Sequence, residues 1–208
     1  MNNQIMLTLV TFFLVAINAE AVSFTTLKSF KSVSAPAWTN SEGACPRCLA
    51  VSSNTLYGTA GYGPGRNGTV FKINTDGMGF TNLYSFSTAN GSAPTNSDGV
   101  NPVGILLSGN VLYGVTRTGG GEGKGTIFRV TTDGTGFTNL YNFTPISDST
   151  YTNSDGVSPG SLVLSGNTLY GTTQFGGRGG GGTIFALTIL PAPIPLNIQH
   201  TRHRGTND

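Results

Sequence analysis

The sequence has few of the residues that carry catalysis and electrostatic recognition. Only 10% of its 208 residues are charged, and the formal net charge is +2. A surface charged so weakly and diffusely argues against a nucleic-acid partner. The two histidines, His200 and His203, both lie in the C-terminal tail. Their position excludes a Ser-His-Asp or Cys-His site built from the rest of the chain.

Long apolar runs are also scarce. The one clear run, Ile5 to Ile17, is too short to span a bilayer and leads into Ala19-Glu20-Ala21, a site where signal peptidase could cut before Val22. This pattern predicts a signal peptide at residues 1–21 and a secreted or cell-surface protein. The first four residues carry no charged side chain, which leaves an uncleaved membrane anchor as the alternative.

Glycine, by contrast, is abundant, with 31 residues, and it recurs in a fixed context. The phrase Asn-x-Leu-Tyr-Gly is followed by a glycine-rich stretch, Gly-Thr-(Val/Ile)-Phe and an Asp-Gly turn. Tyr57, Tyr113 and Tyr170 mark three copies at intervals of 56 and 57 residues. A period of this length, filled with short strand-like pieces, is typical of propellers and related repeat folds.

One copy divides at its turns into four strands. Residues rich in Val, Ile, Phe, Tyr and Thr are separated by Ser-Gly-Asn and Asp-Gly turns, which supply the positive φ that tight hairpins need. The predicted strands of the middle copy are 103–107, 111–117, 126–131 and 137–143. Each unit is therefore predicted to be a four-stranded antiparallel blade. Apolar residues on both strand faces indicate sheets packed between two neighbours.

The copies are incomplete at the two ends. Residues 24–30 match the last strand of a unit, whereas the third copy lacks a last strand because Pro191, Pro193 and Pro195 follow. We therefore expect an all-β, propeller-like array of three blades over residues 22–190, in which the N-terminal strand completes the last blade. Residues 191–208 are expected to be a proline-rich linker and a disordered tail.

Three blades are fewer than the roughly 4 to 8 with which propellers usually close. Three arrangements remain open: a homodimer that completes a six-bladed ring, an open or unusually tight three-blade array, and a shortened version of a longer protein. The proline-rich segment, which reads as a linker into a further domain, slightly favours the last of these.

The repeated segments resemble a known family. The stretches NTLYGTTQFGGRGGGGTIF, TDGTGFTNLYNF and TNSDGVSPGSLVLSG are similar to those of the bacterial choice-of-anchor tandem repeat proteins, also called GloVer repeat proteins. The resemblance covers residues 24–190. It implies a secreted or surface protein with a propeller-like fold and a variable C-terminal region, but no activity. The chain departs from the family in its few repeats and in having no recognisable anchor.

The cysteines and the glycine-rich loops offer candidate sites. Cys45 and Cys48 form the only C-x-x-C, which favours a local disulfide or free thiols over redox or zinc chemistry, since no histidine or second pair completes a metal set. Each loop carries one cation that could meet an acidic glycan; the simpler interpretation is a solvated hairpin loop. These cations are Arg66, Lys124 and Arg178.

Acidic residues recur at turns. Asp76 and Asp133 occupy Asp-Gly turns, and Asp98 and Asp155, with Glu42 in the first copy, occupy Asn-Ser-(Asp/Glu)-Gly connectors. One carboxylate per turn is too few for a calcium loop, so turn geometry is the favoured explanation, and no metal or cofactor is expected.

Two functional classes remain. The first is a secreted binding or structural module that contacts an extracellular glycan or a cell-surface protein. The second is an extracellular carbohydrate-active enzyme, a lyase or hydrolase, with Asp98 and Asp155 converging near the blade axis. Tyr57, Tyr113 and Tyr170 could line a sugar-binding surface, although a repeated aromatic residue beside glycine more often packs between blades. The uniform turns of all copies favour the first class.

Overall fold

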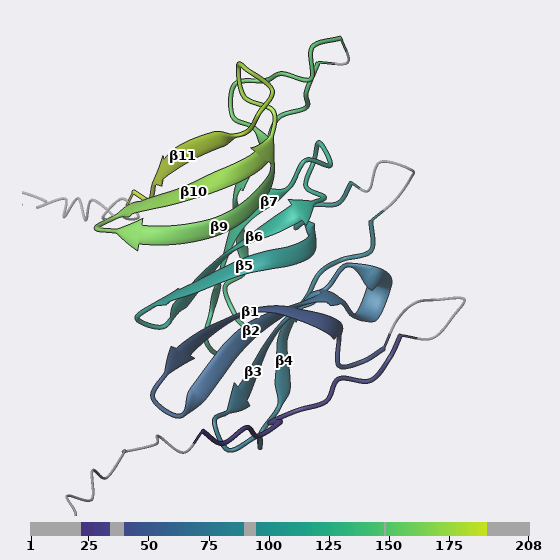
Figure 1. Ribbon diagram of the computed structural model, residues 1–208, viewed down its shortest axis with the longest axis vertical. Helices are drawn as coiled ribbons and strands as arrows, with labels where there is room; N and C mark the ends of the chain where they lie inside the picture. The colour runs from purple at the N-terminus through teal and green to yellow at the C-terminus, as the bar shows by residue number, and fades with distance from the viewer. Residues whose placement is uncertain (1–21, 34–39, 90–94, 148, 191–208) are drawn as a thin grey trace, which may run out of the picture.

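The computed structural model describes residues 22–33, 40–89, 95–147 and 149–190. The predicted signal peptide, residues 1–21, and the predicted tail, residues 191–208, lie outside the described residues. The structure is an all-β, propeller-like stack of three antiparallel sheets (Figure 1), with strand orders β1-β2-β3-β4, β5-β6-β7-β8 and β11-β10-β9. We call these sheets blades 1, 2 and 3.

The strands follow the predicted repeat closely. Blade 1 contains β1 (Ala44–Ser52), β2 (Thr55–Tyr62), β3 (Thr69–Asn74) and β4 (Thr81–Ser85), with a short 3-10 helix, η1 (Pro64–Arg66), between β2 and β3. Blade 2 contains β5 (Val100–Ser108), β6 (Val111–Thr118), β7 (Thr126–Thr131) and β8 (Thr138–Asn142). Blade 3 contains β9 (Val157–Ser165), β10 (Thr168–Phe175) and β11 (Thr183–Thr188).

The first strand of blade 2 begins earlier than predicted, and the same bulge recurs in the other two blades. Strand β5 starts at Val100, before the predicted start at residue 103, and its register against β6 shifts between Pro102 and Gly104. Asn101 in this bulge has a φ of 59°, and its counterparts Cys45 and Ser158 have 57° and 56°. A bulged strand with a left-handed residue and a proline does not show the regular alternation that identifies strands in a sequence.

The glycine and phenylalanine of the repeated phrase form one packing unit. Gly114 pairs with Phe128 across β6 and β7, as Gly58 does with Phe71 and Gly171 with Phe185. A Cβ atom on Gly114 would lie 2.3 Å from Cζ of Phe128, and the other two pairs are equally tight. The tyrosine is therefore followed by glycine because the phenylalanine ring of the next strand lies over that position.

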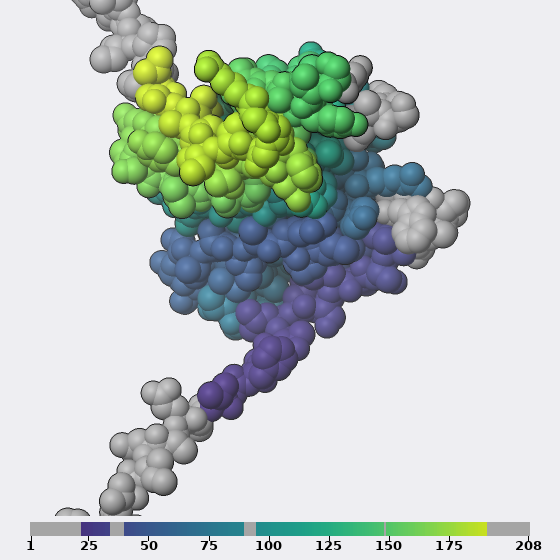
Figure 2. Space-filling view, turned by 45° about the horizontal axis from the view of Figure 1, so that its top comes forward, coloured from purple at the N-terminus to yellow at the C-terminus, as the bar shows by residue number. Residues whose placement is uncertain are grey.

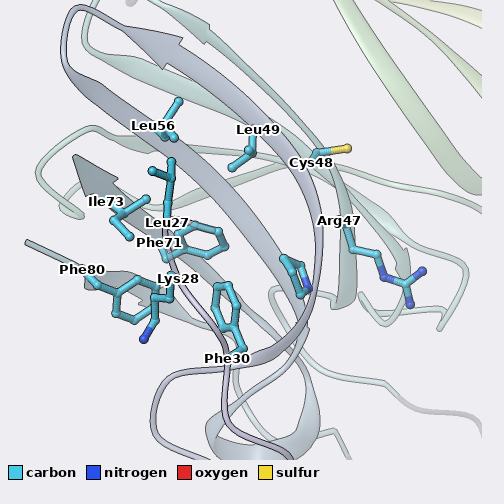
Figure 3. Close-up of a pocket in the computed structure, with 11 residues that line it drawn as sticks. Leu27, Lys28, Phe30, Arg47, Cys48, Leu49, Leu56, Phe71, Ile73 and Phe80 are labelled. Carbon is cyan, nitrogen blue, oxygen red and sulfur yellow. The ribbon is translucent and has the colours of Figure 1, made fainter. Parts of the chain in front are cut away.

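The N-terminal segment, residues 22–33, corrects one part of the prediction. It does not complete blade 3, which has three strands. Instead it lies against blade 1, at the end of the stack opposite to β11 (Figure 2). Phe30 packs its ring against Phe71 and Phe80, at centroid distances of 5.3 and 5.6 Å (Figure 3). Apolar contact with blade 1 holds this segment in place. Blade 3 lies at the far end of the stack, so the segment does not reach it.

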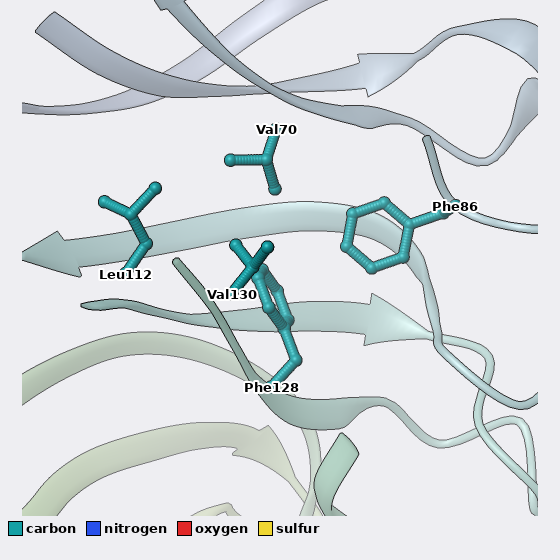
Figure 4. Close-up of a cluster of buried hydrophobic side chains, with 5 residues drawn as sticks. All are labelled: Val70, Phe86, Leu112, Phe128 and Val130. Carbon is teal, nitrogen blue, oxygen red and sulfur yellow. The ribbon is translucent and has the colours of Figure 1, made fainter. Parts of the chain in front are cut away.

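The core lies between the blades. Between blades 1 and 2, a cluster of buried side chains comes from both sheets (Figure 4): Val70, Phe86, Leu112, Phe128 and Val130. A second cluster joins blades 2 and 3, formed by Val115, Ile127, Phe143, Leu162 and Leu169. Blade 2 is therefore buried on both faces, which explains why its strands carry apolar residues on both sides, as the sequence predicted.

Candidate functional site

The repeated tyrosines belong to the packing between blades. Tyr57 packs against the cluster between blades 1 and 2, and Tyr113 packs against the cluster between blades 2 and 3. Tyr170 occupies the same position in blade 3 and is 42% exposed. The structure therefore does not bring the three rings to one sugar-binding surface. Each lies on the face that its blade turns toward the next copy.

Asp98 and its counterpart Asp155 hold connectors in place. Asp98, 3% exposed, accepts hydrogen bonds from the Tyr84 hydroxyl at 2.7 Å and from the Ser87 amide at 2.8 Å. Asp155 accepts the same two kinds of bond from Tyr141 and Thr144, at 2.7 and 2.9 Å. Each carboxylate thus ties the start of one blade to the outer strand of the blade before it.

The pKa shifts in these clusters have a structural cause. Burial, followed by the hydrogen bond to Asp155, raises the pKa of Tyr141 from 10.0 to about 12, and the pKa of Tyr84 is raised for the same reasons beside Asp98. Burial alone would raise the pKa of Asp155, but hydrogen bonds from Thr144 and Tyr141 outweigh it and leave the pKa lowered. Both carboxylates therefore already accept hydrogen bonds within the connectors, which removes support for a hydrolytic pair built from them.

Hydrogen bonds to asparagine side chains hold the glycine-rich loops of blades 2 and 3 against their connectors. Asn153 Oδ1 accepts hydrogen bonds from the amides of Gly156 and Gly177, at 2.8 and 2.7 Å, so one side chain joins the connector to the loop. Asn96 makes the equivalent bonds to Gly99 and Gly120 in blade 2.

The three loop cations are not equivalent. Arg66 ends η1 with a φ of 72°, Lys124 is half-buried beside its bridge to Gly119, and Arg178 is exposed. Because they differ in exposure and in local backbone, the loops do not present a repeated cationic site.

The cysteines are free thiols. Cys45 is exposed, while the Cys48 thiol is half-buried and donates to the Val103 carbonyl at 2.8 Å. The local disulfide that the spacing allowed is not formed. In the part of the chain that the structure describes, no group of three or more His, Cys, Asp or Glu residues could hold a metal ion. Asp133 acts as a turn residue, and hydrogen bonds from Thr131 and Thr135 lower its pKa to about 2.

A groove that crosses the blades was not predicted from the sequence. It has a volume of about 450 Å³ and takes side chains from all three blades, among them Arg47 of β1, Arg117 of β6 and Gln174 of β10. We call it the inter-blade groove. All three of these side chains are exposed, and Arg117 Nη2 donates to Gln174 Oε1 at 3.4 Å. Among the described residues, neither arginine forms an ion pair with a carboxylate.

The groove is where the copies differ. Arg47 aligns with Val103 and Gly160, and Arg117 aligns with Gly61 and Gln174. Gly61 leaves space for Arg47, since a Cβ at position 61 would come within 3.2 Å of the arginine Nε. The Arg47 guanidinium extends away from the apolar residues beside it (Figure 3). Comparing the copies for differences, rather than for shared residues, is the signal that could have revealed the groove.

No family model and no curated protein matches the chain. Solved structures resemble parts of it: a nidogen/laminin complex (17% identity, 69% of this chain, 44% of that chain, TM-score 0.47), TolB from Acinetobacter baumannii (12%, 78%, 32%, 0.44) and the GH74 enzyme of Niastella koreensis (18%, 69%, 28%, 0.34). The chain thus spans less than half of each of these three. At TM-scores below 0.5, these likenesses carry no functional argument. The described part of the chain also has no helix of the length and apolarity needed to cross a membrane.

Proposed function

We propose that this β-repeat module acts outside the cell and binds an acidic glycan along the inter-blade groove. The observation that carries the proposal is the pair of guanidinium groups, Arg47 and Arg117, exposed in one groove without a carboxylate partner among the described residues. A guanidinium recognises a carboxylate through two parallel hydrogen bonds, which suits the uronic acids of acidic polysaccharides.

Neutral groups in the groove suit the rest of a sugar chain. Gln174 offers an amide, and Ser158 and Thr172 offer hydroxyls beside it. Side chains of this kind donate to and accept from sugar hydroxyls. Exposed charge pairs contribute little one at a time, so a polymer that meets several groups at once is a better ligand than a single sugar.

The extracellular location rests on the sequence. The predicted signal peptide at residues 1–21 and the resemblance to choice-of-anchor (GloVer) repeat proteins both support it. We infer membership of that family from the repeated phrases alone. If the location is right, protein recovered from the medium of the producing cell begins at Val22; protein retained with an intact N-terminus would contradict it.

Titration with polygalacturonate, an acidic glycan, and with dextran, a neutral one, tests the binding proposal. The purified protein should bind polygalacturonate more tightly, and rising salt should weaken that binding. Arg117→Gln should lower the affinity about tenfold, because a charge-assisted hydrogen bond is lost. Glutamine already stands at the aligned position 174, so the blade accepts it.

The exposed Arg178 provides a matched control outside the groove. Arg178→Gln removes the same charge and should leave the affinity within about twofold, since it takes no part in the proposed contacts. Equal binding of both glycans, or an equal loss of affinity in both variants, would refute the proposal.

A further inference from the structure

The N-terminal segment occupies the place of an outer strand from a preceding blade. By sequence, Lys28 aligns with Tyr84 and Tyr141, and Glu42 aligns with Asp98 and Asp155. The aligned pairs make the same contact: Lys28 Nζ lies 3.1 Å from Glu42, and each tyrosine hydroxyl lies 2.7 Å from its aspartate. Residues 24–30 therefore meet blade 1 as β4 meets blade 2 and as β8 meets blade 3.

The aromatic contacts repeat in the same way. Phe86 packs on Phe128 at a centroid distance of 5.2 Å, and Phe143 packs on Phe185 at 5.4 Å. Their counterpart Phe30 packs on Phe71 at 5.3 Å. The segment thus takes the place of a fourth strand, and because no strand among the described residues pairs with it, it forms no ladder.

Blade 3 has the complementary gap. Ile184 of β11 aligns with Val70 and Ile127, which are 0% and 1% exposed because the next blade covers them. Ile184 is 85% exposed. Among the described residues no strand pairs with the outer edge of β11, whereas β4 and β8 pair with the same edge of β3 and β7. An open strand edge with an apolar face is a template for another strand.

The face of blade 1 that lies behind the N-terminal segment is open as well. Leu49 is 60% exposed, while its counterpart Leu162 in blade 3 is 9% exposed beneath blade 2. With Leu56 and Phe71, it lines a pocket of about 350 Å³ on this face (Figure 3). The two ends of the stack thus expose the two surfaces that join wherever blade meets blade inside it.

A pocket on blade 3 fits a phenylalanine of the missing strand. It has about 350 Å³ and is lined by Tyr141, Phe143 and Phe185. In blade 2, Phe137 stacks on Tyr84 at a centroid distance of 3.9 Å, next to Phe86 and Phe128, the counterparts of those three residues. Phe24 aligns with Phe137 and is 91% exposed.

We propose that residues 24–30 of a second copy supply the fourth strand of blade 3, and that two copies exchange these strands to close one ring. Two copies bring six blades, which lies within the usual range of about 4 to 8, whereas one copy or three copies would fall outside it. Each contact joins the end of one copy to the start of the other, and two such contacts close the assembly. The inference is independent of the ligand proposed above.

The internal copies give the register of the exchanged strand. In blade 2, Thr126 pairs with Asn142 and Arg129 pairs with Thr138. By alignment, Thr183 should pair with Ser29 of the second copy, and Ala186 should pair with Thr25. Thr26, one residue along, should point to the opposite face of the sheet.

Cysteine cross-linking tests this register in the purified protein. The background carries Cys45→Ser and Cys48→Ser, which place at both positions the serine that the third copy already has. Thr25→Cys combined with Ala186→Cys should give a disulfide-linked dimer after mild oxidation with diamide, because paired residues bring their Cβ atoms within disulfide range. The control pair, Thr26→Cys with Ala186→Cys, should cross-link at least tenfold less.

Non-reducing gels and light scattering read the outcome. A dimer band from the first pair only, together with a solution mass of two chains before oxidation, supports the exchange. A mass of one chain, or equal cross-linking by both pairs, would overturn it. A filament would show as masses beyond two chains and would overturn the closed ring. Measuring glycan binding separately on the same samples keeps the two proposals apart.

Discussion

Gly114→Ala tests whether the repeated glycine is required by the phenylalanine ring that covers it. A Cβ at position 114 would lie 2.3 Å from Cζ of Phe128, whereas ordinary contact begins near 3.4 Å. The ring would have to move by about 1.1 Å, the difference between those distances. Phe128 is fully buried, with Phe86 and Phe137 packed against it at 5.2 and 5.6 Å. Little space remains for that movement.

The expected cost follows from overpacking. Forcing a methyl group into a filled core lowers the free energy of unfolding by about 1–3 kcal/mol. Replacing glycine with alanine in a strand raises it by about 0.5–1 kcal/mol. Overpacking is the larger effect, so the free energy of unfolding should fall by about 1–2 kcal/mol. For a chain of this size, Tm should drop by about 2–8 °C, measured by circular dichroism. Gly121→Ala is the matched control, because no atom lies within 4 Å of its Cβ.

A double-mutant cycle isolates the contact. Phe128→Leu shortens the side chain and removes the clash with the ring, while the Gly104 carbonyl oxygen stays 2.9 Å from the new Cβ. Gly114→Ala should therefore cost clearly less in that background than in the wild type. The coupling free energy should then be about 1 kcal/mol or more. Strict additivity of the two changes, or a wild-type Tm for Gly114→Ala, would refute this explanation of the repeated phrase.

Two further predictions concern the connectors. Asp98→Ala should lower the free energy of unfolding by about 2–3 kcal/mol in urea titrations, because it leaves buried donors unpaired, whereas Asp76→Ala in an exposed turn should cost less than about 1 kcal/mol. The pKa of Tyr141 is raised from 10.0 to about 12 because folding favours its neutral form. The contribution of Tyr141 to the free energy of unfolding is therefore fully present below pH 10.0 and is lost as the pH rises toward about 12. Tyr141→Phe should flatten the fall of the urea midpoint between about pH 9 and pH 11.5, and an unchanged profile would contradict the assignment.

The blades could be predicted because their signals are local. Turns such as Ser108-Gly109-Asn110 need residues that tolerate positive φ, and they mark strand ends wherever they recur. Strand β7 begins and ends where the sequence predicted. The start of β5 was missed because a bulge at Asn101 breaks the alternation of the strand.

Neither the position of residues 24–30 nor the inter-blade groove could be predicted from single motifs. The segment matches an outer strand in sequence, but it forms no strand of its own, and its sequence does not say which blade it accompanies. Its contacts with Phe71 and Phe80 place it beside blade 1. Arg47 and Arg117 stand at positions that vary between copies, so a search for shared residues passed over them.

Light scattering on the purified protein at micromolar concentration tests most directly the central claim, that the two open ends of the stack belong together. We predict a mass of two chains, which Ile184→Asp should reduce to one by placing a charge on the face that the second copy covers. A wild-type mass of one chain at all concentrations, or a mass of two chains unchanged in Ile184→Asp, would contradict the claim.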